Sequence, residues 1–461
     1  MTGAVRSPSA LAGPWPFDPI GDALGRIRAE FAGEHRGAVA DYIPQLSSAD
    51  PDAFGLALVG VAGSTYSAGE ADVPFTIQSI SKPFTYALAL ADVGTDGVLA
   101  RVGVEPSGEA FNAISLEPGT GRPSNPMINA GAILTTSLVQ GTGPDERFER
   151  IRALLSRCAG RELGVDEAVF RSEHDTGDRN RALAYLMRHA GSMTMDVEDA
   201  VDVYFRQCSV LVTAVDLATM AATLANGGVN PRTDEVAINQ EVAEQVLTVM
   251  ATCGMYDYSG EWLFRVGLPA KSGVAGGIVA VSPSQFGIGL YSPRLDERGN
   301  SVRGVEASQA ISERFSLHLM HQIGKSAPTF ERMAPSTGGT VAVDGDGTAV
   351  TVAEDARDAE IAVLAVQGYL EFAAAEQALL SLRSHADDTE PPEALVIDLS
   401  HVTRCHPVAT ALLDSTNALI AQRGVLVVTV DRRRRGLLVS EAEFSSRVEA
   451  LEFCRSAGGD G

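Results

Sequence analysis

Short apolar runs at two separated places in the chain predict the strands of a single sheet. Residues 55–61, 277–281 and 286–291 are runs of apolar residues and glycine, each about the length of a strand. Between them, from about residue 111 to about residue 250, apolar residues recur at helical spacing. This order predicts a sheet built from both ends of one domain, with a helical insertion between its strands.

A different alternation of apolar segments appears toward the C-terminus. Strand-like segments at residues 361–366, 394–399 and 425–430 alternate with helix-like segments at residues 372–382 and 408–421. Strands that alternate with helices in this way are typical of βαβ units. The C-terminal part is therefore expected to form a small α/β domain of its own.

Proline and glycine mark the boundary between the two parts. Pro328, Pro335, Gly338 and Gly339 fall in one short segment, and such punctuation is typical of a linker. At 461 residues the chain is also longer than one hydrophobic core usually supports. The predicted parts are a flexible N-terminus (1–16), a first domain (17–325), a linker (326–347), a second domain (348–456) and a tail (457–461).

Composition and charge narrow the class of protein. The hydrophobic fraction of 45% is that of a globular protein, and the net charge of -23 disfavours binding to nucleic acid or to anionic membranes. We interpret the basic run at residues 432–435 as the solvated first turn of a helix. No apolar stretch reaches the length of a membrane span, and the N-terminus lacks the apolar core of a secretion signal. A cytoplasmic protein is therefore expected.

The first candidate for chemistry is an S-x-x-K motif, formed by Ser79 and Lys82, where a strand-like segment meets an apolar, helix-like one. Residues three apart share a helix face, so the two side chains would lie one turn apart. A serine needs a neighbouring base to act as a nucleophile, and burial can lower the pKa of a lysine enough for it to be that base. The helix start also offers backbone N–H groups to a developing oxyanion.

A second candidate is the glycine-rich turn KSGVAGG at residues 271–277, directly before an apolar strand. Glycine lets the backbone approach a ligand closely, and a strand edge beside the nucleophile can donate a second N–H to the oxyanion. An S-x-x-K motif followed by a K-[ST]-G turn resembles the serine β-lactamases and penicillin-binding proteins. That likeness implies an α/β fold of the β-lactamase or transpeptidase type, with a mostly antiparallel sheet and a helical insertion.

Five further segments resemble the serine-dependent glutaminase family more specifically. In chain order they are VADYIPQL (39–46), NPMINAGAI (125–133), TGDRN (176–180), MAATLANGG (220–228) and CGMYD (253–257). The resemblance implies hydrolysis of L-glutamine to L-glutamate and ammonia through a covalent glutamyl-serine intermediate, with no metal and no organic cofactor. The five cysteines agree, because they are widely spread and include no CxxC pair.

The same resemblance implies the catalytic residues. Ser79 would be the nucleophile, and Lys82 the base that accepts its proton. Tyr256 and Tyr42 resemble the tyrosines that line the family's reaction centre, where a phenol can relay a proton to the departing ammonia. The backbone N–H groups of Ser79 and Val274 would form the oxyanion hole.

Recognition of glutamine also requires groups for its α-ammonium and α-carboxylate. Glu173 supplies the negative charge that an ammonium needs. Asn129, Asn180 and Tyr204 offer neutral hydrogen-bonding groups for the carboxylate. The residues that the resemblance places against the substrate are Gln78, Ser79, Asn129, Glu173, Asn180, Tyr204, Tyr256 and Val274.

The second domain is similar to the STAS domain of sulfate transporters and anti-sigma factor antagonists. Residues 394–400, ALVIDLS, match its central strand and the turn after it. Regulatory members usually carry a phosphorylatable serine at the next helix start, where this chain has His406 and Pro407. Binding of a regulatory nucleotide, binding of a partner protein and contact with its own counterpart all stay open for this domain. The glutaminase resemblance also implies a homo-oligomer, a dimer or tetramer.

Three other functions stay open at the level of sequence. A penicillin-recognising serine hydrolase shares the two motifs but acts outside the cytoplasm. An asparagine amidohydrolase would bind a substrate that is shorter by one methylene, a difference that residue types do not resolve. The non-enzymatic alternative is a regulatory STAS protein with an inactive glutaminase-like domain, although every proposed catalytic residue is present.

Overall fold

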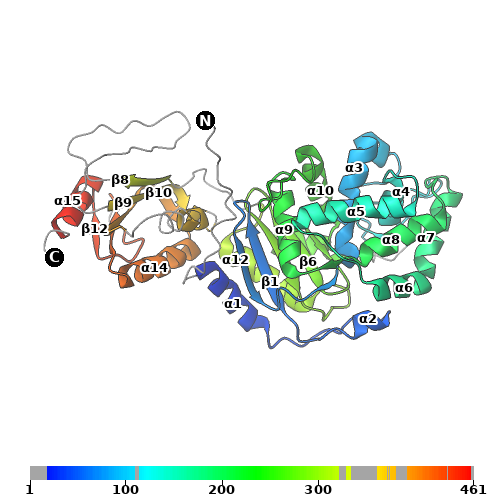
Figure 1. Ribbon diagram of the computed structural model, residues 1–461, viewed down its shortest axis with the longest axis horizontal. Helices are drawn as coiled ribbons and strands as arrows, with labels where there is room; N and C mark the ends of the chain where they lie inside the picture. Colours follow the sequence, from blue (N-terminus) through cyan, green and yellow to red (C-terminus); the bar gives the residue numbers. More distant parts are fainter. Residues whose placement is uncertain are drawn as a thin grey trace. The chain divides into compact units, whose positions relative to one another are not determined.

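The computed structural model shows a chain of two compact units (Figure 1). The first unit is built chiefly from residues 20–313, and the second chiefly from the residues after 320. Each unit has its own five-stranded sheet. The residues that the structure describes are 18–108, 114–320, 329–333, 361–370, 372, 374–380, 392–432 and 435–457.

The sheet of the first unit combines strands from both ends of that unit, as the apolar runs predict. Its strands are β1 (Gly55–Gly60), β2 (Thr65–Gly69), β5 (Ala270–Ser272), β6 (Gly277–Ser282) and β7 (Phe286–Tyr291). They lie in the order β2-β1-β7-β6-β5, and all neighbours are antiparallel. The short strands β2 and β5 add to the predicted set, because neither is a continuous apolar run.

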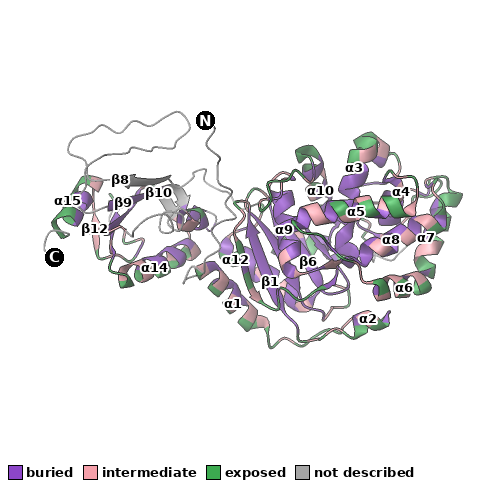
Figure 2. Ribbon diagram, in the orientation of Figure 1, coloured by how far each residue is buried: buried purple, intermediate pink, exposed green. Residues whose placement is uncertain are grey.

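Helix α9 (Ala214–Ala225) covers one face of this sheet at close range. Gly287 and Gly289 of β7 face it, and a Cβ atom added to either glycine would lie 2.1 Å from a backbone atom of α9. The helix brings small side chains to this contact, among them Ala218 and Ala222. Glycine on the strand therefore lets the two backbones meet, and almost all of α9 is buried (Figure 2).

Helix α12 (Val302–Phe315) approaches the opposite face. Ile278 of β6 is paired with Leu290, the residue after a glycine that faces α9, so its side chain points away from α9. There it lies against Gly304 of α12. Because both faces are covered, β1, β6 and β7 are buried at every position (Figure 2). This burial explains why their sequences are continuous apolar runs.

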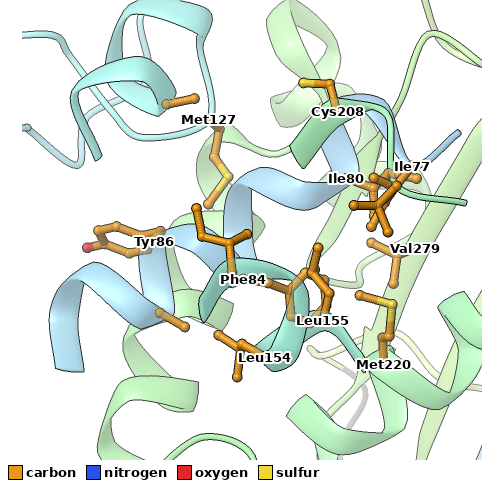
Figure 3. Packing of buried hydrophobic residues seen from close by; sticks show 14 of the residues in the cluster. Ile77, Ile80, Phe84, Tyr86, Met127, Leu154, Leu155, Cys208, Met220 and Val279 are labelled. Atoms are coloured by element: carbon orange, nitrogen blue, oxygen red, sulfur yellow. The ribbon is translucent and has the colours of Figure 1, made fainter. Parts of the chain in front are cut away.

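The predicted helical insertion lies between β2 and β5. Within it α3 contacts several other helices, and Ile80 and Phe84 pack with Leu155, Met220 and Val279 in one core that also reaches the sheet (Figure 3). The start of α3 is therefore held between the helices and the sheet. The helices of the first unit are α1 (Pro19–Phe31), α2 (Pro44–Ser47), α3 (Ser81–Leu99), α4 (Asn129–Leu138), α5 (Pro144–Ala159), α6 (Glu167–Thr176), α7 (Asp178–His189), α8 (Val197–Cys208), α9, α10 (Gln240–Cys253), α11 (Ser259–Arg265) and α12.

Asp216 anchors the N-terminus of α9, and its loss should destabilise the unit. Its carboxylate accepts hydrogen bonds from the backbone N–H and the hydroxyl of Thr213, and Arg161 Nε donates to it at 2.7 Å. Asp216→Ala removes this capping box and leaves Arg161 without its carboxylate partner. We expect the free energy of unfolding, measured in urea, to fall by about 2 kcal/mol.

Asp196→Ala is the matched control for that change. Asp196 also caps a helix, α8, but both side chains of its ion pair with Arg188 are about half exposed. Its loss should cost at most about 1 kcal/mol. Equal losses in the two variants would contradict the anchoring role of the buried cap.

The second unit is an α/β domain with a mostly parallel sheet. Strands β9 to β12 are parallel, β8 is antiparallel to β9, and the order is β12-β11-β10-β9-β8. The strands and helices predicted from the alternating pattern are present. They are β9 (Ile361–Leu370), a helical segment at 374–380, β10 (Ala394–Cys405), α14 (Pro407–Gln422) and β11 (Leu426–Val430). The unit also contains three elements that the pattern does not predict, β8 (Thr329–Met333), β12 (Ala442–Phe444) and α15 (Arg447–Ala457).

Two segments of the second unit differ from expectation. Arg432 and Arg435 are not helical; instead Arg435 Nε donates to the buried Asp431 at 2.8 Å, and its Nη1 donates to Val402 O. The buried carboxylate at the end of β11 therefore holds a turn where a helix start was predicted. Part of the predicted linker forms β8, and the rest lies outside the described residues. So do the predicted flexible N-terminus and most of the tail, and the domain boundaries stay a prediction.

The described residues also bear on membranes and metals. Within them, no helix has the length and apolar character needed to cross a membrane. The same residues contain no group of three His, Cys, Asp or Glu side chains arranged to hold a metal ion. All five cysteines are free thiols.

Candidate active site

Ser79 lies in a short 3-10 turn, η2 (Gln78–Ile80), that leads directly into α3. The turn follows strand β3 (Phe75–Thr76), which pairs with β4 (Leu211–Val212). Gln78 has a left-handed backbone conformation with φ of 49°, which is uncommon for a residue with a side chain and is often found at functional sites. Ser79 is therefore at a helix start, as the S-x-x-K motif predicts, and it is buried.

The buried side chain of Gln207 holds this turn through a chain of hydrogen bonds. Gln207 of α8 donates from Nε2 to Ser81 Oγ, and Ser81 Oγ in turn donates to Gln78 O at 2.8 Å. Gln207 Oε1 accepts hydrogen bonds from the hydroxyls of Thr85 and Thr136, each at 3.1 Å. One side chain thus connects α3, α4 and α8 beside the nucleophile.

Lys82 is 1% exposed and lies one helical turn after Ser79. Its Nζ donates to Asn129 Oδ1 at 2.7 Å and to Met127 O at 3.3 Å. Neither acceptor is charged, and burial lowers the pKa of Lys82 from 10.5 to about 8. A minor fraction of Lys82, about a tenth at pH 7, is therefore neutral, and a neutral amine can accept a proton.

Tyr256 is the hydrogen-bond partner of the Ser79 hydroxyl. It begins the short turn η3 (Tyr256–Tyr258) in a left-handed conformation with φ of 57°. Its hydroxyl is hydrogen-bonded to Ser79 and donates to Ser272 O at 3.2 Å. Because the phenol proton goes to Ser272, Ser79 is the donor toward Tyr256. Burial raises the pKa of Tyr256 to about 12, against the effect of these two hydrogen bonds.

Ser79 and Lys82 have different hydrogen-bond partners, and the role of Lys82 as the base for Ser79 stays a prediction. In the part of the chain that the structure describes, the hydroxyl of Ser79 bonds to Tyr256, whereas the hydrogen bonds of Lys82 Nζ go to Asn129 and Met127. The phenol therefore receives the nucleophile's hydrogen bond in place of the amine.

The glycine-rich turn lies beside the nucleophile. Gly273 closely approaches Ile77 and Gln78, and Gly276 N–H bonds back to Gly273 O at 2.9 Å. Val274, inside this turn, is buried, and its backbone N–H donates no hydrogen bond to the described residues. An available N–H next to the nucleophile is what an oxyanion hole requires, so the role assigned to Val274 has a geometric basis and stays a prediction.

A buried carboxylate forms a second part of the site. Glu173 of α6 is 7% exposed, and its Oε1 accepts hydrogen bonds from the Tyr42 hydroxyl at 2.8 Å and from Gln78 Nε2 at 3.2 Å. Burial raises its pKa, against the effect of these two bonds. Among the described residues, no Lys, Arg or His forms an ion pair with Glu173. A buried carboxylate without a cation favours a cationic ligand.

The predicted carboxylate-binding residues also lie together. Asn129 Nδ2 donates to Asn180 Oδ1 at 3.0 Å, and the Tyr204 hydroxyl donates to Asn129 Oδ1 at 3.3 Å. The same Oδ1 accepts from Lys82. Asn129 therefore connects the proposed base to the neutral groups expected to bind the α-carboxylate.

Two residues of this site have no role in the sequence-based assignment. Lys271 is buried against the ring of Tyr256; its K-[ST]-G motif is the signal that points to it. Gln207 has no such signal, because one glutamine in an amphipathic helix resembles any other. Its importance appears only when three helices meet around it.

Comparisons with known proteins agree with this geometry. The glutaminase family profile matches residues 37–320. Glutaminase 2 of Bradyrhizobium diazoefficiens is 44% identical over 440 residues, which are 93% of this chain and 67% of that protein. The glutaminase of Corynebacterium glutamicum is 42% identical over 416 residues, which are 90% of this chain and 94% of that protein. The similarity therefore extends into the second unit.

Solved structures give the same result. The structure of the probable glutaminase ybaS is 41% identical, with a TM-score of 0.65. The match covers 66% of this chain and 100% of that chain. Mglu in its glutamate form is 39% identical with a TM-score of 0.65, over 90% of this chain and 98% of that one. The first unit has their β-lactamase-like fold, with an antiparallel sheet and a helical insertion. This chain belongs to the glutaminase family.

Proposed function

We propose that this chain hydrolyses L-glutamine to L-glutamate and ammonia through a covalent glutamyl-serine intermediate on Ser79. One observation carries the proposal: Ser79 and its phenol partner lie close to both a buried amine and a buried carboxylate. The carboxylate, Glu173, contacts Gln78, the residue directly before the nucleophile. The amine, Lys82, has a lowered pKa because it is buried. A nucleophile, a base and an ammonium site are thus within one short stretch of structure.

In the acylation step, Ser79 Oγ attacks the side-chain amide carbon of glutamine. We infer that its proton passes to the Tyr256 oxygen while the Tyr256 hydroxyl turns from Ser272 O and gives its own proton to the neutral Lys82 amine, so the phenol is never left ionised. The carbonyl oxygen takes the negative charge beside the N–H groups of Ser79 and Val274. The C–N bond then breaks, Lys82 returns the proton to the nitrogen, and ammonia leaves.

In the deacylation step, water attacks the glutamyl ester and passes its proton along the same route to Lys82. The ester bond breaks, Ser79 regains its proton and glutamate leaves. One water is consumed for each glutamine. Every proton that Lys82 accepts is returned, so the base is regenerated in each cycle.

The direct test is release of glutamate and ammonia from glutamine by the purified chain, with asparagine and a penicillin-type reporter run in parallel. Turnover of glutamine far above the other two is expected. Faster turnover of asparagine or of the reporter would favour one of the two enzymatic alternatives. No turnover of any substrate would favour the inactive, regulatory alternative.

The lowered pKa of Lys82 predicts how the rate depends on pH. Only the neutral amine accepts a proton, so kcat/KM for glutamine should rise as pH increases through about 8. The measurement is a pH profile of kcat/KM between about pH 6 and pH 10. A profile that is flat over this range would contradict the assignment of Lys82 as the base.

Glu173→Gln tests recognition of the substrate ammonium. Removal of the charge should raise KM for glutamine about 100-fold, because a buried charge pair is lost, while a glutamine analogue without the α-amine should lose no further affinity. Glu198→Gln is the control, because Glu198 is an exposed carboxylate that pairs with Arg181. An equal effect of Glu173→Gln on both substrates would contradict the ammonium assignment.

For the second unit we propose a STAS-like regulatory domain, supported by the parallel order of β9 to β11 and by α14 starting directly after β10. His406 Nδ1 accepts the Val408 N–H at 3.2 Å, so this residue caps α14 as an ordinary helix start. Self-association as a dimer or tetramer, a regulatory ligand or partner of this unit, and a cytoplasmic location stay predictions. Light scattering of the purified chain tests the first.

A further inference from the structure

Gln207 of α8 is an uncharged, fully buried side chain enclosed by three helices. Its Oε1 accepts hydrogen bonds from Thr85 of α3 and Thr136 of α4, each at 3.1 Å. Its Nε2 donates to Ser81 Oγ at 3.3 Å. A shift of any one of these helices would leave a buried polar group without its partner, which is costly. The amide therefore fixes where α3, α4 and α8 lie relative to one another.

The same three helices meet a second time, at the proposed reaction centre. There Asn129 Oδ1 accepts hydrogen bonds from Lys82 Nζ at 2.7 Å and from the Tyr204 hydroxyl at 3.3 Å. Lys82 belongs to α3, Asn129 to α4 and Tyr204 to α8. Each helix thus contributes one residue to this junction and one to the junction at Gln207.

The two junctions use the same face of each helix. On α3 and α8 the residue of the second junction follows that of the first by three positions, and on α4 by seven. Three and seven residues are about one and two helical turns, so both residues of each helix share a face. The amide oxygens of Asn129 and Gln207 are therefore the centres of two neighbouring layers in one three-helix contact.

Gln207 is also connected to the turn of the nucleophile. Ser81 Oγ, which accepts the hydrogen bond of Gln207 Nε2, donates to Gln78 O at 2.8 Å. Gln78 directly precedes Ser79 and has the left-handed φ of 49°. Such a conformation persists only where the surrounding contacts fix it. Two hydrogen bonds in series therefore join Gln207 to the turn that holds Ser79.

We propose that Gln207 is a positioning residue for the reaction. Its amide oxygen aligns the three helices whose side chains meet at Asn129, and its amide nitrogen holds the turn of Ser79 through Ser81. Glutamine suits both tasks, because one planar amide accepts two hydrogen bonds and donates others in fixed directions. The inference rests on the proposed function.

Variants that each remove one hydroxyl separate the two tasks. Thr136→Val removes a donor to the amide oxygen. The contact at Asn129, which is expected to bind the α-carboxylate, should loosen, so KM for glutamine should rise about 10-fold with a smaller loss of kcat. Ser81→Ala removes the link to the turn of Ser79 and should lower kcat about 10-fold, with KM within about twofold of the wild type. Gln207→Met removes both effects and should lower kcat/KM about 100-fold.

A double-mutant cycle tests whether Gln207 acts through Ser81. In the Ser81→Ala background, Gln207→Met should lower kcat by a smaller factor than it does in the wild type, because the shared link is already broken. This non-additivity concerns kcat of the folded enzyme, so a merely structural role of Gln207 would not produce it. Fully additive losses of kcat would contradict the link.

Asn230→Leu is the matched control. Asn230 is also a fully buried amide, and it lies in the loop after α9, outside the proposed site. Its side chain likewise makes three hydrogen bonds, with Arg157 O, Cys158 O and the backbone N–H of Arg232. Its variant should unfold at a lower Tm but keep kcat/KM within about twofold.

All constants are measured well below the Tm of each variant. Wild-type kcat and KM in Gln207→Met, or an equal loss of kcat/KM in Asn230→Leu, would overturn the inference. If thermal unfolding shows that Gln207→Met does not fold, Thr136→Val and Ser81→Ala carry the test, and wild-type constants in both would overturn it. A wild type without turnover would refute the proposed function and the inference together, whereas an active wild type with unaffected variants would overturn the inference alone.

Discussion

Ser79→Ala should lower kcat for glutamine hydrolysis by about five orders of magnitude, because the covalent intermediate cannot form without its oxygen. The remaining contacts still bind the substrate, so the affinity for glutamine should change little. Acid-quenched wild type, sampled during turnover, should carry a glutamyl ester on the peptide that contains Ser79. Mass spectrometry should find no such adduct in Ser79→Ala.

Ser308→Ala is the matched control for that variant. Ser308 is also a buried serine at a helical position, and its hydroxyl donates to Gly304 O of α12 at 2.7 Å. It lies outside the proposed site, so its variant should keep kcat within about twofold while losing a similar hydrogen bond. Activity in Ser79→Ala above about one hundredth of the wild-type value would rule out Ser79 as the nucleophile.

The architecture of the first unit could largely be predicted because its strands are covered on both faces. Full burial turns β1, β6 and β7 into apolar runs, which are visible in the sequence. The short β5 contains the polar residues Lys271 and Ser272, so it does not form an apolar run and could not be predicted in this way. The close contact of α9 with β7 could not be predicted either. Two glycines in a strand can have many structural causes, and a helix packed against the strand backbone is only one of them.

The sequence could predict that certain residues lie together in the candidate site, where their roles stay a prediction, but it could not predict their pairing. The motifs contain Ser79, Lys82 and Tyr256, and the structure brings all three together. Which of them bonds to the Ser79 hydroxyl depends on how η3 and β5 meet, through Tyr256 and the Ser272 carbonyl. That meeting is a tertiary contact between segments with no pattern in common, so local sequence carries no information about it.

The basic run in the second unit shows the reverse case, in which a local pattern misleads. Four consecutive arginines after a strand look like a solvated helix start. The structure instead pairs Arg435 with Asp431, a carboxylate buried at the end of β11. Residue type alone does not show that Asp431 is buried, and a buried carboxylate requires a partner. Arg435 therefore pairs with a buried carboxylate where a solvated side chain was predicted.

Lys82→Met should lower kcat for glutamine by about 10³- to 10⁴-fold and abolish the rise of activity through about pH 8, because the group that titrates there is gone. Lys82→Arg separates loss of the base from loss of positive charge. Arginine keeps a cation at the position but cannot give up its proton, so this variant should be as inactive as Lys82→Met. Substantial activity in Lys82→Arg would contradict the role of Lys82 as a base.

Lys82→Met should raise the stability of the fold, although it lowers activity. Burial lowers the pKa of Lys82 from 10.5 to about 8, so below about pH 8 the folded chain must hold a buried charge that the unfolded chain keeps in water. Lys82→Met removes that cost and should raise Tm near neutral pH. Between about pH 8 and pH 10.5 the unfolded wild type binds more protons than the folded one, so the stability of the wild type rises with pH and the advantage of Lys82→Met shrinks.

A variant that is less stable than wild type at pH 7 would show that the hydrogen bonds of Lys82 to Asn129 and Met127 outweigh the cost of its burial. The predicted result, with lower activity and higher stability together, would identify Lys82 as a residue retained for chemistry at the expense of the fold.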